Sequence, residues 1–498
     1  MSSQNSALRI TAVTASAQLG GTERMLLDFA SRAFEHDIAL KVLTPLKGPL
    51  VRIFANMGIP TSVVPAPGAM LRGSQQVGHL GSLPLALAGL WKWSRQLVAH
   101  EFLREADVAY SVAFKSHLAL ALARCHPVVW HLHEFPPATT GKLWWLLAGR
   151  IPDALIANSE AVGEAWWGGG SEGRREKGKG KRDSEGRSGE RERGSGAGPP
   201  FRRCVVIPNG VNLDRFKPAE RTHWIHDQLR IPREHRLVGM PAVFARWKGQ
   251  IETIEAFSRI VDEHPDVHLV IVGGSIYDTL AEREFGRELE VEIDRAATGE
   301  WAAVTPEGSP EPGEGPFTAG QAPTHDLVPP GPDTALEGPA PCSRLPFTNK
   351  QARQYCGDGP APRTPLPRIH HLPFQPKIEK TYPEFDLAVH YSLRPEPFGR
   401  VVVEAMACGV PVIAADEGGP REILGGRVGD RCEAGWLAEP RNPEALARVL
   451  CSALALSAAD RRAIGSAGRR RAEDRYSWRR FAAEVSGVLR GTADRRHR

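Results

Sequence analysis

Cysteine pairs, long apolar runs and a strong excess of one charge are all missing from this 498-residue sequence. No C-x-x-C pair is present, and the seven cysteines lie far apart, at positions 125, 204, 342, 356, 408, 432 and 451. We therefore expect neither a disulfide framework nor a structural zinc site, and a reducing cytoplasm fits this cysteine usage. No stretch approaches the roughly 18 uncharged apolar residues of a spanning helix. Residues 1–16 lack the basic flank and long apolar run of a secretory signal.

Charge is nearly balanced, because 63 lysines and arginines face 58 aspartates and glutamates. This balance argues against a dedicated nucleic-acid-binding protein, so we expect no nucleic-acid partner. With 41% hydrophobic and 24% charged residues, the composition is that of a globular protein. At about 150 residues per domain, the length predicts two to three domains.

Two segments have compositions that disfavour packed structure. Residues 168–198 contain nine lysines or arginines, six acidic residues and a single alanine as the only apolar side chain. Because these charges alternate in sign, we interpret the segment as a solvated loop rather than a tail for nucleic acid or anionic lipid. Residues 298–367 carry 15 of the 41 prolines without a period, which is typical of extended or disordered chain.

The rest of the chain alternates short apolar strands with helical patterns, in two similar series. The first series has expected strands at Leu8–Thr14, Ile38–Leu43, Val128–Leu132 and Ala154–Ala157, with a helix at Glu23–Phe34. The second has expected strands at Leu237–Val243, Val267–Val272, Phe385–Tyr391 and Val412–Ala415, with helices at Gln250–Glu263 and Phe398–Cys408. This pattern predicts the α/β class: two halves, each a parallel sheet with helices on both faces. Such halves bind ligands in the crevice at the carboxyl ends of their strands.

The segment EPFGRVVVE places two glutamates, Glu396 and Glu404, around the expected start of a helix. A helix N-terminus offers free N–H groups and a positive dipole end, which suit a phosphate. Phe398 and Gly399 would offer backbone N–H groups to a diphosphate or a sugar hydroxyl, and the two carboxylates could accept hydrogen bonds from vicinal hydroxyls. The spacing alone fits equally well an ordinary capped helix with surface glutamates.

With this E-x7-E segment and the AMACGVPVIAADEGGPREI that follows it, the chain resembles the family 4 glycosyltransferases of the GT-B fold. The resemblance extends, in the family's order, to LGGTERMLLDFA, VVWHLHE, ALIANSEAV, VVIPNGVNLDRFKP, FARWKGQ and HLVIVGG. It implies two facing Rossmann-like domains, a nucleotide-sugar donor bound mainly by the second and an acceptor bound mainly by the first. It also implies transfer with retention of configuration, usually without a metal.

Domain boundaries follow from this resemblance. We expect residues 1–205 to form the N-terminal acceptor domain, with the insertion at about 168–200. Residues 206–475 would form the C-terminal nucleotide-sugar-binding domain, with the Pro-rich insertion at about 298–367. Residues 476–498 would form a C-terminal helix that packs back on the N-terminal domain.

By similarity, Glu404 matches the glutamate that binds the donor ribose, and Glu396 the one near the transferred sugar. Arg246 and Lys248 match an arginine and a lysine placed against the donor diphosphate, where fixed cations stabilise the charge of the leaving group. No D-x-D metal motif is present, so we expect no metal in the reaction and no cofactor other than the donor itself. Only Trp247 separates the two basic residues, whereas many family members have several residues there, so the match is closer for Lys248 than for Arg246.

The resemblance also assigns His133 to face the transferred sugar, although His131 would point the same way if the strand continued. We expect His133 to bind a sugar hydroxyl rather than to act as a general base. Glycines allow close backbone approach to a ligand, although plain turns would need them too. The remaining residues expected at the donor are Arg400, Val401, Gly20, Gly21, Gly418 and Gly419.

These expectations describe a metal-independent, retaining hexosyltransferase-type enzyme that moves a sugar from a nucleoside-diphosphate donor to an acceptor hydroxyl. The expected setting is polysaccharide, glycolipid or cell-envelope glycan synthesis, with a glycan or lipid-linked acceptor. Two alternatives stay open. One is another GT-B activity, such as an epimerase or a phosphorylase. The other is a non-catalytic, glycosyltransferase-like scaffold whose cleft the insertions have disabled.

Two stretches mix apolar, aromatic and basic residues, at Leu85–Leu103 and Lys142–Arg150. Such amphipathic stretches can lie in the interface of a bilayer. Helices packed on the first sheet would have the same composition, so both interpretations remain open. We expect a cytoplasmic protein with possible peripheral contact at the inner face of a membrane.

Overall fold

The computed structural model describes residues 7–68, 83–125, 127–137, 147–167, 203–276, 279–297, 368–426 and 431–495. The two inserted segments expected at 168–200 and 298–367 lie outside these residues. So do residues 142–146 of the second amphipathic stretch.

The first sheet has seven parallel strands in the order β3-β2-β1-β4-β5-β6-β7. Its strands are β1 (Leu8–Val13), β2 (Ile38–Thr44), β3 (Thr61–Val63), β4 (Val108–Ser111), β5 (Val128–Leu132), β6 (Ala154–Ala157) and β7 (Cys204–Val206). The segments that connect them include α1 (Gly21–Ala30), the 3-10 turn η1 (Ala33–His36), α2 (Pro49–Asn56), α4 (Leu83–Ala99), α5 (Glu101–Glu105), α6 (Phe114–Leu122) and α8 (Glu160–Trp167). Alternate residues of β5 enter different apolar clusters, Val129 on one side and Val128 and Trp130 on the other. Both faces are therefore buried, as parallel sheets require.

The second sheet has six parallel strands in the order β10-β9-β8-β11-β12-β13. Its strands are β8 (Arg236–Pro241), β9 (Val267–Gly273), β10 (Ile369–Pro373), β11 (Leu387–His390), β12 (Val412–Ala415) and β13 (Gly435–Ala438). Its helices include α9 (Trp224–Leu229), α10 (Gln250–Ser258), α11 (Leu280–Ala297), α12 (Arg400–Ala407), α13 (Gly418–Leu424), α14 (Pro443–Leu454) and α15 (Ala458–Arg475). The α/β class with two parallel sheets, expected from the sequence, is confirmed.

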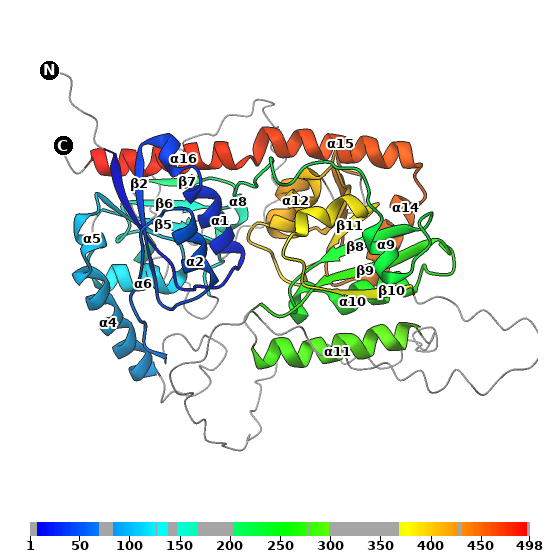
Figure 1. The fold of residues 1–498 in the computed structure, drawn as a ribbon, viewed down its shortest axis with the longest axis horizontal. Coiled ribbons are helices and arrows are strands. Elements are labelled where there is room, and N and C mark those ends of the chain that lie inside the picture. The colour runs from blue at the N-terminus through cyan, green and yellow to red at the C-terminus, as the bar shows by residue number, and fades with distance from the viewer. Residues whose placement is uncertain are drawn as a thin grey trace, which may run out of the picture. The chain divides into compact units, whose positions relative to one another are not determined.

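The last helix, α16 (Trp478–Asp494), packs on the first sheet rather than the second (Figure 1). It contacts α1, β4 and β5. Its buried residues Phe481, Val485 and Leu489 join the cluster that contains Leu26 and Phe29 of α1. The core of the first half is therefore completed by residues from the far end of the sequence.

None of the described helices combines the length and the apolar character that a bilayer crossing requires.

Candidate active site

Lys248 and Glu396 form an ion pair at the carboxyl edge of the second sheet. Lys248 ends the 3-10 turn η4 (Arg246–Lys248) after β8, and Glu396 lies in the loop after β11. Because β8 and β11 are parallel neighbours, their carboxyl ends open onto the same edge. The Nζ atom of Lys248 lies 2.6 Å from Oε2 of Glu396, and the two side chains are only 14% and 16% exposed.

Two further groups hold the Glu396 carboxylate. The hydroxyl of Ser392 donates to Oε2 at 3.0 Å, and Nε2 of His390 lies 3.7 Å from the same oxygen. Burial alone would raise the pKa of Glu396, but the Lys248 ammonium, with His390 and Ser392, holds that pKa below its ordinary value. Burial also lowers the pKa of His390 to about 4. At neutral pH this edge therefore presents a fixed carboxylate beside a fixed ammonium.

Glu404 lies one turn into α12, and its side chain is held from two sides. The Tyr382 hydroxyl donates to Oε2 at 3.0 Å, and Nε of Arg400 lies 3.5 Å from Oε1. Tyr382 is fully buried and Glu404 is 7% exposed. The carboxylate is therefore oriented before any ligand arrives, which favours selective hydrogen bonding.

Arg400 connects the two halves of the molecule. One of its terminal nitrogens lies 3.0 Å from Oδ2 of Asp28 on α1, and the other donates to the carbonyl of Gly210 at 3.2 Å. Burial raises the pKa of Asp28, while the charge of Arg400 opposes that rise. Arg400 thus joins α1, the segment after β7 and Glu404, and the donor contact expected from the sequence stays a prediction.

Gly418 and Gly419 pack against the backbone of the loop that carries Glu396. The N–H of Gly419 donates to the carbonyl of Glu396 at 2.8 Å. A Cβ on Gly418, which has a φ of 62°, would lie 2.4 Å from that carbonyl oxygen. A Cβ on Gly419 would lie 2.4 Å from the carbonyl oxygen of Phe398. These glycines therefore let α13 approach the loop, a role separate from the donor contact expected from the sequence.

His133 follows β5 on the first sheet and lies beside His131, with ring centroids 4.1 Å apart. His131 is fully buried, with Nδ1 2.5 Å from the Tyr110 hydroxyl. His133 has Nδ1 3.4 Å from the amide nitrogen of Asn158, while its Nε2 is buried without a hydrogen-bond partner among the described residues. Burial, together with the charge of Arg400, lowers the pKa of His133 to about 3. A neutral imidazole results, suited to bind a hydroxyl.

A small cavity of about 10 Å³ opens beside His133, room for about one water molecule. It is lined by Val112, Ala113, Phe114, His117, Leu132, His133, Glu134 and Trp166. Burial raises the pKa of Glu134. The cavity lies after β4 and β5, at the carboxyl edge of the first sheet.

Arg246 does not join Lys248 and Glu396. Its side chain is 65% exposed, and its guanidinium pairs with Glu288 on α11 and lies over the ring of Phe285. The two basic residues, separated only by Trp247, therefore have different partners, Glu288 for Arg246 and Glu396 for Lys248.

The remaining residues expected at the donor differ in their burial and in the groups that a ligand could contact. Phe398 is buried and packs edge-on against Tyr476, so only its backbone is available. Val401 is half-buried. Gly20 precedes α1 and accepts from the N–H of Arg24, while a Cβ on Gly21 would meet nothing within 4 Å. Gly21 is exposed, so a side chain would be tolerated there and the donor contact expected of this glycine stays a prediction.

Glu422 on α13 is a second link between the halves, and sequence reasoning missed it. Its carboxylate accepts from the N–H groups of Glu160 and Ala161 at 2.8 and 2.7 Å, which caps the N-terminus of α8. Burial raises the pKa of Glu422, and these two hydrogen bonds oppose the rise. The only signal in the sequence was an acidic residue in GGPREIL, which reads equally well as a surface glutamate.

Comparison with known families identifies the segment that carries the two glutamates. Residues 364–471 match the model of the family described as Glycosyl transferases group 1. This range contains Glu396, α12 with Glu404, and the two glycines at the start of α13.

Curated relatives include two enzymes named D-inositol 3-phosphate glycosyltransferase. The one from Thermobispora bispora is 36% identical over 304 residues, which cover 60% of this chain and 53% of the relative. The one from Geodermatophilus obscurus is 29% identical over 300 residues, covering 60% of this chain and 49% of the relative. The chain thus spans about half the length of the curated relatives it matches.

Solved structures share the whole architecture. Anabaena HepE in complex with UDP and glucose superposes with a TM-score of 0.63 at 22% identity, over 97% of this chain and 99% of that one. Sucrose-phosphate synthase from Thermosynechococcus elongatus superposes with a TM-score of 0.64 at 17% identity, over 97% and 98%. At these identities the likeness establishes the fold. The chain therefore has the two-domain fold of the GT-B glycosyltransferases, and its residues 364–471 match the model described as Glycosyl transferases group 1.

Proposed function

We propose that the protein is a retaining glycosyltransferase, which moves a sugar from a nucleoside-diphosphate donor to an acceptor hydroxyl. The observation that carries this proposal is the Lys248–Glu396 pair at the carboxyl edge of the second sheet. Open α/β sheets bind ligands at that edge. The family match over residues 364–471, which contain Glu396, supports the assignment, and polysaccharide, glycolipid or cell-envelope glycan synthesis is the setting we propose.

Each residue has a distinct part in this proposal. Lys248 balances the charge that builds on the leaving diphosphate, because a cation fixed in advance needs no reorganisation during the reaction. Glu396 accepts hydrogen bonds from hydroxyls of the transferred sugar, and Glu404 accepts them from the ribose. Neutral His133 binds a sugar hydroxyl from the first half. The chain's own cation thereby does what a metal does in other transferases.

A uracil nucleotide is the first donor to test, because HepE was solved with UDP and with UDP-glucose. We expect UDP, among a panel of nucleoside diphosphates, to raise the Tm by about 5 °C at about 100 times its Kd. Replacing Glu404 with glutamine should weaken UDP binding about 10- to 100-fold, the value of a hydrogen bond to a charged group. Thermal shift with and without nucleotide measures both effects.

The matched control for Glu404→Gln is Glu444→Gln on α14, whose carboxylate is 63% exposed. It should keep the full response to UDP. A protein stabilised by none of the nucleotides would support the scaffold alternative instead. Epimerised donor formed without an acceptor would support an epimerase.

We also propose that the acceptor is lipid-linked and that α4 rests on an anionic membrane. Buried Leu90, Trp93 and Leu97 hold α4 on the first half. Its outer face exposes Leu85, Leu87 and Trp91, at 67%, 55% and 61%. Lys92 and Arg95 are exposed on the same helix. Apolar side chains flanked by cations are the pattern of a helix lying in a bilayer interface.

Flotation with vesicles tests this membrane contact. The protein should float with vesicles containing anionic lipid at low salt, and the double substitution Leu87→Ser and Trp91→Ser should reduce the bound fraction about tenfold or more. Leu280→Ser on α11, where Leu280 is 68% exposed, is a matched apolar control that should float normally. Equal loss in both variants, or no flotation of the parent protein, would end the membrane proposal and leave the donor proposal intact.

A further inference from the structure

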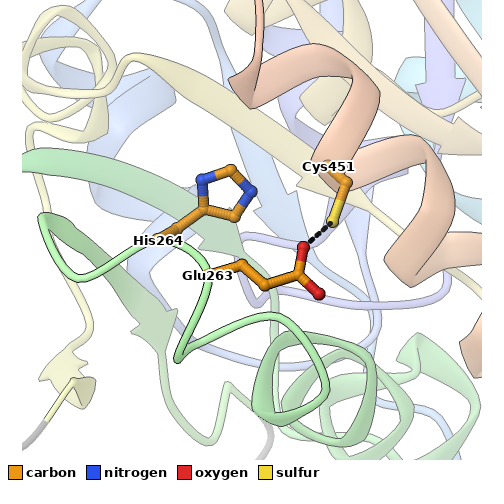
Figure 2. Close-up of side chains that lie close together, drawn as sticks. All are labelled: Glu263, His264 and Cys451. Atoms are coloured by element: carbon orange, nitrogen blue, oxygen red, sulfur yellow. Dashed lines mark hydrogen bonds between the residues drawn. The ribbon is translucent and has the colours of Figure 1, made fainter.

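We infer that Glu263, His264 and Cys451 form a binding site for zinc or a similar divalent transition metal (Figure 2). One ligand atom from each residue, a carboxylate oxygen, an imidazole nitrogen and a thiol sulfur, lies within 4.8 Å of the other two. Figure 2 shows the three side chains converging from two separate segments of the chain. No part of the proposed transferase reaction uses these residues.

The segment that carries Glu263 and His264 is held rigidly. The N–H groups of both residues donate to the carbonyl of Ile260 at 3.2 Å. The guanidinium of Arg368 donates to the carbonyls of Val261 and His264 at 2.9 and 3.2 Å. The backbone that presents the carboxylate and the imidazole is therefore fixed before a metal arrives, which favours affinity.

Cys451 is presented by the last turn of α14. Its Sγ lies 3.9 Å from Oε2 of Glu263. This distance is long for a hydrogen bond, but it is close to the distance between two ligand atoms bound to the same metal ion. Tetrahedral zinc with bonds of about 2.3 Å to sulfur and about 2.0 Å to oxygen places the two ligands about 3.5 Å apart. A shift of a few tenths of an ångström would therefore bring these atoms to bonding geometry.

The ligand set indicates which metals fit. Magnesium and calcium prefer oxygen ligands alone, whereas sulfur, imidazole and carboxylate together suit zinc and its neighbours in the first transition series. Binding would replace the thiol proton of Cys451 with the metal and release that proton to solvent. Glu263 is exposed, so a water molecule can take the fourth position.

The place of the cluster indicates a structural or regulatory role. Glu263 and His264 precede β9, and α14 runs back from the carboxyl edge to its end at Leu454. The cluster therefore lies at the amino edge of the second sheet, opposite Lys248 and Glu396. A bound metal would tie the turn between α10 and β9 to α14, which packs on α10. No zinc motif could be recognised in the sequence, because His264 and Cys451 are far apart along the chain.

Cobalt provides a direct spectroscopic test. The full-length protein, freed of any histidine tag, is titrated with Co²⁺ under reducing conditions. We expect a sulfur-to-cobalt charge-transfer band that disappears on adding Zn²⁺. The Cys451→Ser variant should lose the band, and His264→Ala should lower the cobalt affinity more than about 10-fold, the loss that even an outer partner of a metal ligand can cause.

The control is Cys125→Ser, which removes a half-buried cysteine outside the cluster and should leave the titration unchanged. His264 lies in a surface turn, so its replacement tests the site even if Cys451→Ser fails to fold. Absence of the band in the parent protein overturns the inference. A charge-transfer band that persists unchanged in Cys451→Ser also overturns the inference, and so does a cobalt affinity that is unchanged in His264→Ala.

Discussion

Replacing Lys248 with alanine is expected to lower kcat/KM for sugar transfer about 100- to 1,000-fold, the loss that follows removal of one group stabilising transition-state charge. The substitution removes the ammonium that lies 2.6 Å from Glu396 and would face the leaving diphosphate. Initial rates of sugar transfer from a nucleotide sugar measure this loss in kcat/KM. Arg246→Ala should cost about threefold at most, because exposed pairs such as Arg246 with Glu288 contribute little.

The pH dependence of the transfer rate provides a second test of Lys248→Ala. Glu396 keeps a depressed pKa because Lys248 opposes the effect of burial. The negative charge of Glu396 is therefore present in neutral solution and is lost only as the pH falls through that depressed value. Without Lys248 the pKa should rise, so the acidic limb of the rate profile should move to higher pH. Equal rate losses in Lys248→Ala and Arg246→Ala, with no shift of this limb, would contradict the assignment.

Replacing Asp28 with alanine is expected to lower the free energy of unfolding by about 3 kcal/mol, because it removes the nearer of the two carboxylates that pair with the buried guanidinium of Arg400. Asp28 lies 3.0 Å from Arg400, and both side chains are at most 15% exposed. The loss should appear as a lower urea midpoint. Donor affinity should also fall, since Arg400 lies beside Glu404.

Asp214 provides the matched control for Asp28. It also pairs with an arginine at 3.0 Å, but Asp214 and Arg479 are 63% and 61% exposed. Asp214→Ala should therefore change stability by less than about 1 kcal/mol. A double-mutant cycle of Asp28→Ala with Arg400→Met isolates the energy of the buried pair. A coupling energy near zero would show that α1 and α12 do not depend on this contact.

Local pattern was enough to predict the α/β class, whereas the roles expected of Glu396, Glu404 and Lys248 came from the family resemblance. Glu396 and Lys248 each follow a strand, and the carboxyl ends of all strands in a parallel sheet open onto the same edge. Helix limits were less certain. The helix expected at Phe398–Cys408 begins at Arg400, because Gly399 takes a φ of 94° that a helix does not contain.

Residues that depend on contacts between distant segments could not be predicted. Asp28 lies in an ordinary amphipathic helix, and its partner Arg400 lies far along the chain on α12. Arg246 and Lys248 are two positions apart on a 3-10 turn, so their side chains leave in different directions, one to Glu396 and the other to Glu288. The sequence alone indicates a surface residue at Glu422, because only the folded structure brings the N-terminus of α8 against its carboxylate. Nothing in the periodicity or spacing of these segments encodes such pairings.

The contact of α16 with the first sheet has a consequence during biosynthesis. A ribosome that has finished β7 has produced every strand of that sheet, yet Phe481, Val485 and Leu489 are still to come. Leu26 and Phe29 therefore await their covering helix while the entire second sheet is being translated. Nascent chains with such uncovered apolar surface are prone to aggregate and are bound by chaperones.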